Sequence, residues 1–169
     1  KTIYSDLWGK RGVFSTIRIV GNKPKYILLL NHIIGINSTL NKLGIRFILS
    51  EKKVFDLIQP LLKKNKIYDH LLRIAISSKF ISFSLRIRLK PSKNYYAIIN
   101  SYQRKNPVFK NLYYKKIIKI LDKIDSQKCE VILSKKGFLL EGCTSNILCI
   151  SDKIIYIPIE DMPDGDNPY

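Results

Sequence analysis

The chain has 169 residues, and 30 lysine and arginine residues against 13 aspartate and glutamate residues give it a net charge of +17 at pH 7. A hydrophobic content of 46% is enough to build a buried core, which excludes a disordered basic tail. The longest apolar run, residues 26–36, is interrupted by Asn31 and His32 and falls short of the roughly 20 residues that a membrane helix needs. The composition therefore predicts a folded chain that does not span a membrane.

The positive charge is mostly lysine, spread through segments that are also rich in isoleucine and asparagine. No block reaches the roughly five or six like charges that mark an interaction tail, so specific nucleic-acid binding is not expected. The cysteines Cys129, Cys143 and Cys149 form no CxxC pair, which argues against a disulfide framework and a metal site and favours a reducing, cytoplasmic location. The sequence starts at Lys1 without a secretory signal, and we expect it to be a fragment or to lack its natural start.

The first part of the chain is predicted to contain both strands and helices. Alternating β-rich residues predict a strand at 12–20, and the turn residues 21–24 lead into a second strand at 26–30. Asn31 is expected to cap a helix that ends at Gly44, and Ser50 is expected to cap another helix that Pro60 bends or shortens. Further β-rich runs at 71–76, 80–89 and 95–99 complete a mixed sheet.

The character of the sequence changes near residue 106. An amphipathic helix of about three turns is predicted after Lys110, with apolar residues such as Ile117 and Leu121 inward and lysines outward. Short strands follow at 129–133, 138–140, 146–150 and 154–157, and Lys135-Lys136-Gly137 fits a hairpin turn between the first two. The fold class is therefore α+β, with an α/β small domain at 1–105 and the start of a β-rich large domain at 106–169.

Few residues suggest chemistry by themselves. His32 and His70 lie in no nucleophile motif, and neither nucleotide-binding glycine motif is present. The segment Glu141-Gly142-Cys143-Thr144-Ser145-Asn146 makes a polar turn between two apolar strands. Such a turn can line a pocket, or it can be an ordinary glycine-containing loop.

Three motifs in the same order resemble the fold-type IV (class IV) pyridoxal phosphate enzymes. These are EGCTSNIL, preceded by CEVILSKKG; Lys110, which lies 31 residues before Glu141; and GVFSTIR, followed by a strand and a helix that contains His32. The family comprises branched-chain aminotransferases, D-amino acid aminotransferases and aminodeoxychorismate lyases. The resemblance implies an amino-acid transformation with pyridoxal 5'-phosphate, either transamination with a 2-oxo acid or elimination of pyruvate, and a homodimer in the complete protein.

The resemblance also implies roles for single residues. Lys110 would form an imine with the cofactor aldehyde, aided by partial desolvation beside Phe109 and Leu112, and would later carry the substrate proton. Glu141 would face the pyridine nitrogen and keep it protonated. Thr144, Ser145 and Asn146 would form hydrogen bonds around the cofactor and substrate, and Phe14 would face the substrate pocket.

The sequence departs from the family pattern in three places. Gly35 stands where the family has a phosphate-binding arginine, Tyr113 or a neighbour replaces an asparagine after the lysine, and family members continue well beyond Tyr169. These departures predict weak binding of the cofactor phosphate. They also leave open two other interpretations: a catalytically inactive remnant, and a basic binding module that uses charged and aromatic residues between 86 and 96 (Arg86, Arg88, Lys90, Lys93, Tyr95, Tyr96).

Overall fold

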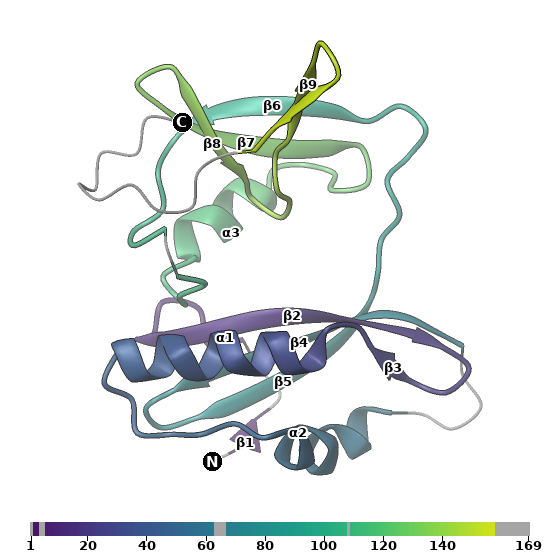
Figure 1. Cartoon of the computed structure of the whole chain (residues 1–169), viewed down its shortest axis with the longest axis vertical. Coiled ribbons are helices and arrows are strands. Elements are labelled where there is room, and N and C mark those ends of the chain that lie inside the picture. The colour runs from purple at the N-terminus through teal and green to yellow at the C-terminus, as the bar shows by residue number, and fades with distance from the viewer. Residues whose placement is uncertain (1, 4–5, 63–66, 108, 158–169) are drawn as a thin grey trace. The chain divides into compact units, whose positions relative to one another are not determined.

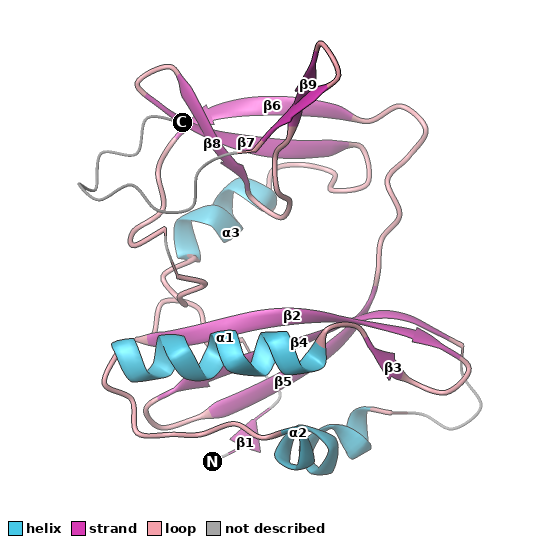
Figure 2. Ribbon diagram, viewed as in Figure 1, coloured by secondary structure: helices cyan, strands magenta, loops and turns pink. Residues whose placement is uncertain are grey.

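The computed structural model describes residues 2–3, 6–62, 67–107 and 109–157. Residue contacts divide the chain into a first unit, Lys1–Arg88 with Phe109–Tyr113, and a second unit, Leu89–Val108 with Tyr114–Tyr169. This division places residues 89–105 with the second unit and residues 109–113 with the first, whereas the sequence suggested a single boundary after residue 105. Each unit has its own sheet, as Figures 1 and 2 show, and each also has its own apolar core.

The sheet of the first unit has five strands in the order β1-β5-β4-β2-β3. They are β1 (Thr2–Ile3), β2 (Gly12–Gly21), β3 (Lys25–Tyr26), β4 (Tyr68–Ser77) and β5 (Ile81–Ile87). β1 runs parallel to β5 and the other pairs are antiparallel, with Phe14 opposite Ala75 and Thr16 opposite Arg73. The alternation that predicted a strand at 12–20 thus marks a central strand of this sheet.

Helices cover the sheet of the first unit: α1 (Leu29–Lys42), α2 (Glu51–Ile58) and the short 3₁₀ helix η1 (Gln59–Leu61). α1 packs on β2, and Ile33, Ile36 and Leu40 are buried in the core (Figure 1). Ser50 caps α2 as predicted, because its Oγ accepts a hydrogen bond from the Lys53 backbone N–H at 3.3 Å.

Two predicted boundaries around α1 are wrong. The strand expected at 26–30 ends at Tyr26, and α1 begins at Leu29 rather than after Asn31. Leu28 adopts a left-handed backbone conformation, with φ of 53°, and this turn starts the helix without a side-chain cap. Leu29 is buried in the core and extends the apolar face of the helix by one turn, which the capping rule for asparagine did not anticipate.

The second unit contains a three-stranded sheet in the order β6-β7-β8 and a separate hairpin. β6 (Tyr96–Ser101) is parallel to β7 (Cys129–Lys135), which is antiparallel to β8 (Phe138–Gly142), and β9 (Cys149–Ser151) pairs with β10 (Ile154–Tyr156). The helix α3 (Lys115–Leu121) has seven residues, so it is shorter than predicted and starts five residues after Lys110. Its Ile117 packs with Val131, Leu133, Leu140 and Cys143.

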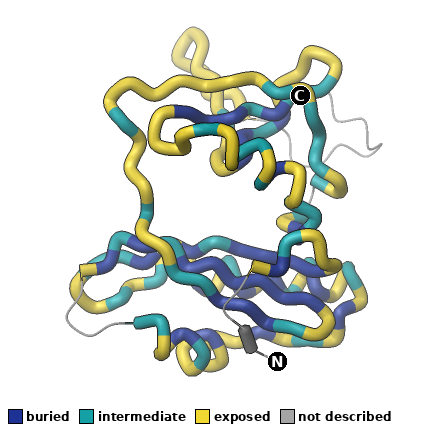
Figure 3. The backbone as a smooth tube through the Cα atoms, turned by 180° about the vertical axis from the view of Figure 1, so that it is seen from behind, coloured by how far each residue is buried: buried dark blue, intermediate teal, exposed yellow. Residues whose placement is uncertain are grey.

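The burial of the two units differs. In Figure 3 the strands of the first unit are largely buried, whereas β9, β10 and most of β6 are exposed. None of the helices in the described residues has the length and apolarity needed to cross a membrane. The same residues contain no group of three or more His, Cys, Asp or Glu side chains that could hold a metal ion.

The predicted α+β class is confirmed. Most predicted strands are present with shifted ends: the strand expected at 80–89 covers Ile81–Ile87, and the strand expected at 146–150 covers only Cys149–Ser151. Positive φ angles at Lys136 and Gly137 confirm the hairpin turn between β7 and β8.

Candidate active site

Lys110 lies in a short extended segment that adds to the edge of β2 in the first unit. Asn111 forms an isolated antiparallel bridge with Val13, the Phe14 backbone N–H donates to the Lys110 carbonyl at 2.8 Å, and the Leu112 N–H donates to the Gly12 carbonyl at 3.0 Å. The structure therefore brings Lys110 and Phe14 together through their backbones.

The side chain of Lys110 is exposed, so the desolvation expected from Phe109 and Leu112 is not found. Leu112 turns into the core and is fully buried, while the Lys110 side chain reaches solvent.

His32 on α1 shares this region with Lys110. The Ser15 hydroxyl lies 2.8 Å from the His32 Nδ1, and Ser15 itself is buried. Burial, and then the positive charge of Lys110, lower the pKa of His32. The imidazole therefore favours its neutral form, in which it can exchange a hydrogen bond with Ser15.

A buried arginine that sequence reasoning missed lies beside Phe14. The Arg73 side chain is only 4% exposed, forms an ion pair with Asp6, and places its guanidinium 3.7 Å from the centre of the Trp8 ring and 5.5 Å from that of Phe14. Its Nε and Nη2 have no hydrogen-bond partner among the described residues. Burial, partly offset by Asp6, lowers the pKa of Arg73 to about 10. Unpaired buried guanidinium N–H groups are costly, which makes Arg73 a candidate partner for an anion.

In the second unit, Glu141 is held by Arg104. Arg104 donates from Nε to Oε1 of Glu141 at 2.5 Å and from Nη2 to Oε2 at 2.7 Å, and Nη2 also donates to the Pro107 carbonyl at 2.9 Å. The Glu141 side chain is 26% exposed, so it remains within reach of a ligand. The sequence carries no local signal for this pair, because its members are 37 positions apart.

The polar turn after Glu141 is tightly built. The Gly142 N–H donates to the Ser145 carbonyl at 3.1 Å, and a Cβ at Gly142 would lie 2.2 Å from the Ser145 Oγ, so only glycine fits. Glu130, which is buried on β7, accepts a hydrogen bond from the Thr144 hydroxyl at 2.6 Å. The three predicted ligand-contacting residues Thr144, Ser145 and Asn146 are exposed on one turn.

Two groups beside this turn are held in their neutral forms. Burial raises the pKa of the Cys143 thiol to about 12, with Glu130 and Glu141 adding to the effect. Burial likewise raises the pKa of Tyr114 to about 12, although Arg104 opposes the shift. At neutral pH neither Cys143 nor Tyr114 is therefore a nucleophile.

Gly35 lies in α1 three residues after His32, where an ideal Cβ would have no other atom within 4 Å. The position offers open space but no cation for a phosphate. Lys110 in the first unit offers an amine, and the turn after Glu141 in the second unit offers a carboxylate, hydroxyl groups and an amide, which are the group types that the aldehyde and ring of pyridoxal 5'-phosphate need. This set of groups lacks the arginine expected for the phosphate.

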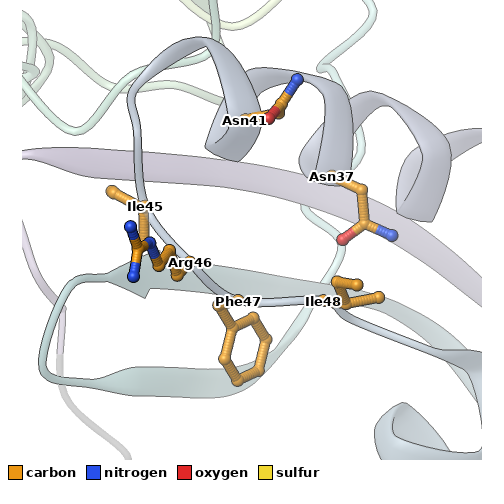
Figure 4. A pocket seen from close by; sticks show the side chains of 6 residues that line it. All are labelled: Asn37, Asn41, Ile45, Arg46, Phe47 and Ile48. Atoms are coloured by element: carbon orange, nitrogen blue, oxygen red, sulfur yellow. The ribbon is translucent and has the colours of Figure 1, made fainter.

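A surface hollow of about 640 Å³ lies elsewhere in the first unit (Figure 4). Its lining consists of Asn37, Asn41, Ile45, Arg46, Phe47 and Ile48. The Asn37 amide is occupied there by hydrogen bonds to the backbone of Leu49, and none of the predicted site residues contributes to the lining. The hollow is not the predicted site.

The residues considered for a basic binding surface belong to different units. Arg86 and Arg88 lie in the first unit, and Lys90, Lys93, Tyr95 and Tyr96 lie in the second. The arginines and the tyrosines therefore belong to different folded units, and the basic binding surface stays a prediction.

Solved structures provide a comparison for the fold. A candidate 4-amino-4-deoxychorismate lyase from Legionella pneumophila matches with a TM-score of 0.66 and 20% identity, covering 94% of this chain and 69% of that one. The branched-chain amino acid aminotransferase from Escherichia coli gives a TM-score of 0.65 and 13% identity, covering 89% of this chain and 58% of that one. The branched-chain aminotransferase from the archaeon Thermoproteus uzoniensis gives a TM-score of 0.66 and 17% identity, covering 88% of this chain and 59% of that one.

These similarities show the shared fold, and the chain spans between 58% and 69% of the length of these three proteins. A comparison with curated protein sequences finds no match. The model of the family Amino-transferase class IV, by contrast, matches residues 12–163, a range that includes Phe14, Lys110 and the turn after Glu141. The chain therefore belongs to the class IV aminotransferase family, whose members depend on pyridoxal phosphate.

Proposed function

We propose that this chain carries part of an enzyme that transfers an amino group between an amino acid and a 2-oxo acid with bound pyridoxal 5'-phosphate. The observation that carries the proposal is the placement of Lys110 beside Phe14 on β2, within the range that the family model matches. Similarity to aminotransferases of known structure supports the same function at the level of the fold.

Five residues would hold the cofactor. Lys110 would bind the aldehyde carbon covalently through Nζ, Glu141 would accept a hydrogen bond from the protonated ring nitrogen, and Thr144, Ser145 and Asn146 would contact the cofactor or substrate. When bound, pyridoxal phosphate supplies an electron sink for the bond broken at the substrate Cα. Arg104 orients the Glu141 carboxylate by a bidentate contact, so the carboxylate needs little rearrangement to meet a ring nitrogen.

Arg73 and Phe14 are suited to substrate recognition. Amino acids and 2-oxo acids both carry a carboxylate, for which a guanidinium offers two parallel N–H groups. Arg73 has two nitrogens without partners among the described residues, and its Asp6 partner is half exposed at 53%, so a substrate carboxylate can compete with Asp6. The Phe14 ring packs edge-on against Trp8 and would form an apolar wall next to this cation.

Lys110 is also the group that would move the substrate proton. The primary amine of lysine is a base of suitable type for this role and would carry the proton at Nζ. Neutral His32 lies close enough for the charge of Lys110 to affect its pKa. The lowered pKa makes the His32 imidazole a weaker base, and in its neutral form it adds no positive charge beside Lys110.

Pyruvate elimination, as in an aminodeoxychorismate lyase, is the second candidate. The similarity to a candidate lyase from Legionella pneumophila supports it. The two reactions are separated by incubating loaded protein with either an amino acid and a 2-oxo acid or with aminodeoxychorismate. Release of pyruvate in the second mixture alone would favour the lyase.

We also propose that the complete protein is a cytoplasmic homodimer without a specific nucleic-acid partner. Light scattering of purified protein tests the dimer, with a mass of one chain as the contrary result. Its small-molecule partners would be amino acids and 2-oxo acids.

Borohydride trapping tests the proposed function directly. The protein is mixed with pyridoxal 5'-phosphate, reduced and digested, and the labelled peptide is identified by mass spectrometry. We expect a visible absorbance band that borohydride bleaches, and a label on Lys110 that Lys110→Arg abolishes. A label confined to Lys115 or Lys116, which start α3, would contradict the assignment.

A further inference from the structure

Glu130 is a buried carboxylate that the proposed reaction does not use. It is 8% exposed, and among the described residues no ion pair involves it. Its oxygens accept two hydrogen bonds instead, Oε1 from the Val131 backbone N–H at 2.9 Å and Oε2 from the Thr144 hydroxyl at 2.6 Å. Buried carboxylates are normally paired with a cation, so the position of Glu130 calls for a reason.

The contact with Glu130 restricts what Thr144 can do. A threonine hydroxyl has one proton to donate and two lone pairs to accept with. Because an ionised carboxylate can only accept, the Thr144 proton is committed to Glu130. Thr144 is exposed, so the free lone pairs of its Oγ1 are available to a ligand. Toward that ligand, Thr144 acts only as a hydrogen-bond acceptor.

The backbone of the turn fixes this geometry. The Cys143 N–H donates to the Val131 carbonyl at 2.8 Å, and the Gly142 N–H donates to the Ser145 carbonyl at 3.1 Å. A Cβ at Gly142 would lie 3.3 Å from Cδ of Glu130 and 2.2 Å from the Ser145 Oγ. The carboxylate and the turn therefore pack directly against each other, and Thr144 has little freedom to aim its proton elsewhere.

The charge around the turn favours a cationic donor. Arg104 pairs with Glu141 through two hydrogen bonds, whereas no ion pair among the described residues involves Glu130. After burial, Glu130 is the next cause of the raised pKa of Cys143, and for Tyr114 it adds to the effect of Glu141, which Arg104 opposes. A ligand group that brings both N–H donors and a positive charge matches the accepting oxygen of Thr144 and the carboxylate behind it, whereas phosphate or carboxylate oxygens do not match that oxygen.

We propose that Glu130 and Thr144 form a pair that presents the Thr144 oxygen to the primary ammonium group of an amino-acid substrate. Thr144 touches the substrate, and Glu130 is a positioning residue that acts through Thr144. The inference rests on the proposed function in that the ammonium group belongs to the amino donor. It assigns to this turn the recognition of the amino donor rather than of the oxo acid.

The first test separates the two substrates by kinetics. Thr144→Val removes the hydroxyl at nearly constant shape, and Thr144→Ser keeps it. In cofactor-loaded protein we expect Thr144→Val to raise the KM for the amino donor about tenfold, with the KM for the 2-oxo acid changed less than about twofold. Thr144→Ser should restore the parent value. Equal increases for both substrates, or none, would overturn the proposal.

The second test needs no cofactor and isolates Glu130. The methyl signal of Thr144 is followed by NMR in threonine-labelled protein during titration with ethylammonium chloride or with sodium acetate. We expect the Thr144 signal to shift saturably with ethylammonium and not with acetate. The affinity for ethylammonium should be about fivefold weaker in Glu130→Gln. Glu51→Gln removes an exposed carboxylate and is the control for a lost charge, so its affinity should equal that of the parent protein. A comparable response to acetate, or an unchanged affinity in Glu130→Gln, would overturn the proposal.

A negative result in these two tests can be distinguished from a failure of the proposed function. If borohydride labels no lysine in the parent protein, the proposed function fails, and the ethylammonium titration still decides whether this turn recognises ammonium. If Lys110 is labelled but the titration shows no ammonium preference, only the pair is wrong. Thermal melting of each variant confirms that it is folded before either comparison.

Discussion

His32 couples the stability of the first unit to pH. Burial and the charge of Lys110 lower its pKa, and the unfolded chain protonates histidine near pH 6.5. Below about pH 6.5 the unfolded state therefore binds more protons than the folded state, so stability is complete above this pH and decreases as the pH falls toward the folded pKa. We expect His32→Gln to flatten this dependence, as measured by urea unfolding at pH 7.5 and 5.5. The same decrease in the variant would assign the effect to other groups.

Gly35 is the position where, under the proposed function, we expect an arginine to add a contact to the cofactor phosphate. It lies within α1, and a Cβ placed there would have no other atom within 4 Å. Gly35→Arg should stabilise the helix by about 1 kcal/mol, because glycine is a poor helix former. It should also tighten binding of pyridoxal 5'-phosphate by roughly tenfold or more through a charge-assisted contact to the phosphate.

Gly35→Ala provides the matched control for this experiment. Alanine gains the same helix propensity but brings no guanidinium, so it should raise the melting temperature without changing the cofactor dissociation constant. The dissociation constants of both variants are measured by absorbance titration. Equal affinities in the two variants would show that the phosphate is held by other groups.

The contact between Arg104 and Glu141 ties the end of β8 to the segment that follows β6. The arginine side chain is 9% exposed and the glutamate 26%, so removing one partner leaves the other poorly solvated. We expect Arg104→Met to lower the unfolding free energy by about 2 kcal/mol and Glu141→Gln to lower it by about half as much, because the amide can still accept a hydrogen bond. Urea unfolding of both variants and of the double variant measures the coupling. A loss below about 0.5 kcal/mol would place the pair among ordinary surface contacts.

Local sequence patterns predicted the elements well where nearby residues alone set the backbone conformation. Alternation located β2, Ser50 located the start of α2, and Lys136-Gly137 located the turn between β7 and β8. The start of α1 was missed because Leu28 adopts a left-handed conformation that its type disfavours. α3 is shorter than its lysine pattern suggested, since an amphipathic repeat marks the buried face and does not fix where hydrogen bonding ends.

The candidate site was predictable only in its motif residues. Lys110 and the turn after Glu141 follow from the family resemblance, whereas Arg104, Arg73 and Glu130 act through contacts between distant strands and segments. Spacing along the chain carries no signal for such pairs. The exposure of the Lys110 side chain could not be predicted from the sequence either, because it depends on how the segment 109–113 joins the edge of β2.

The distribution of site residues between the two units has a consequence for the whole chain. Lys110, Phe14 and Arg73 belong to the first unit, while Glu141, Arg104 and Glu130 belong to the second. The chain enters the second unit at residue 89, returns to the first for residues 109–113 and leaves it again at 114. The backbone of Lys110 is thus held against β2 in the first unit, and the Arg104–Glu141 pair lies in the second.

The net charge of +17 predicts one further property of the whole molecule. Lysine and arginine side chains bind any polyanion by releasing its counterions, so we expect weak association with DNA and RNA oligonucleotides that does not depend on sequence. If several phosphates are contacted, affinity should fall by roughly a thousandfold between about 50 and 200 mM salt. Fluorescence anisotropy with oligonucleotides of scrambled sequence and equal length measures both features, and prior loading of the protein with pyridoxal 5'-phosphate should leave them unchanged. Binding that survives physiological salt with a clear sequence preference would show that a nucleic acid is a specific partner and would contradict the proposed absence of one.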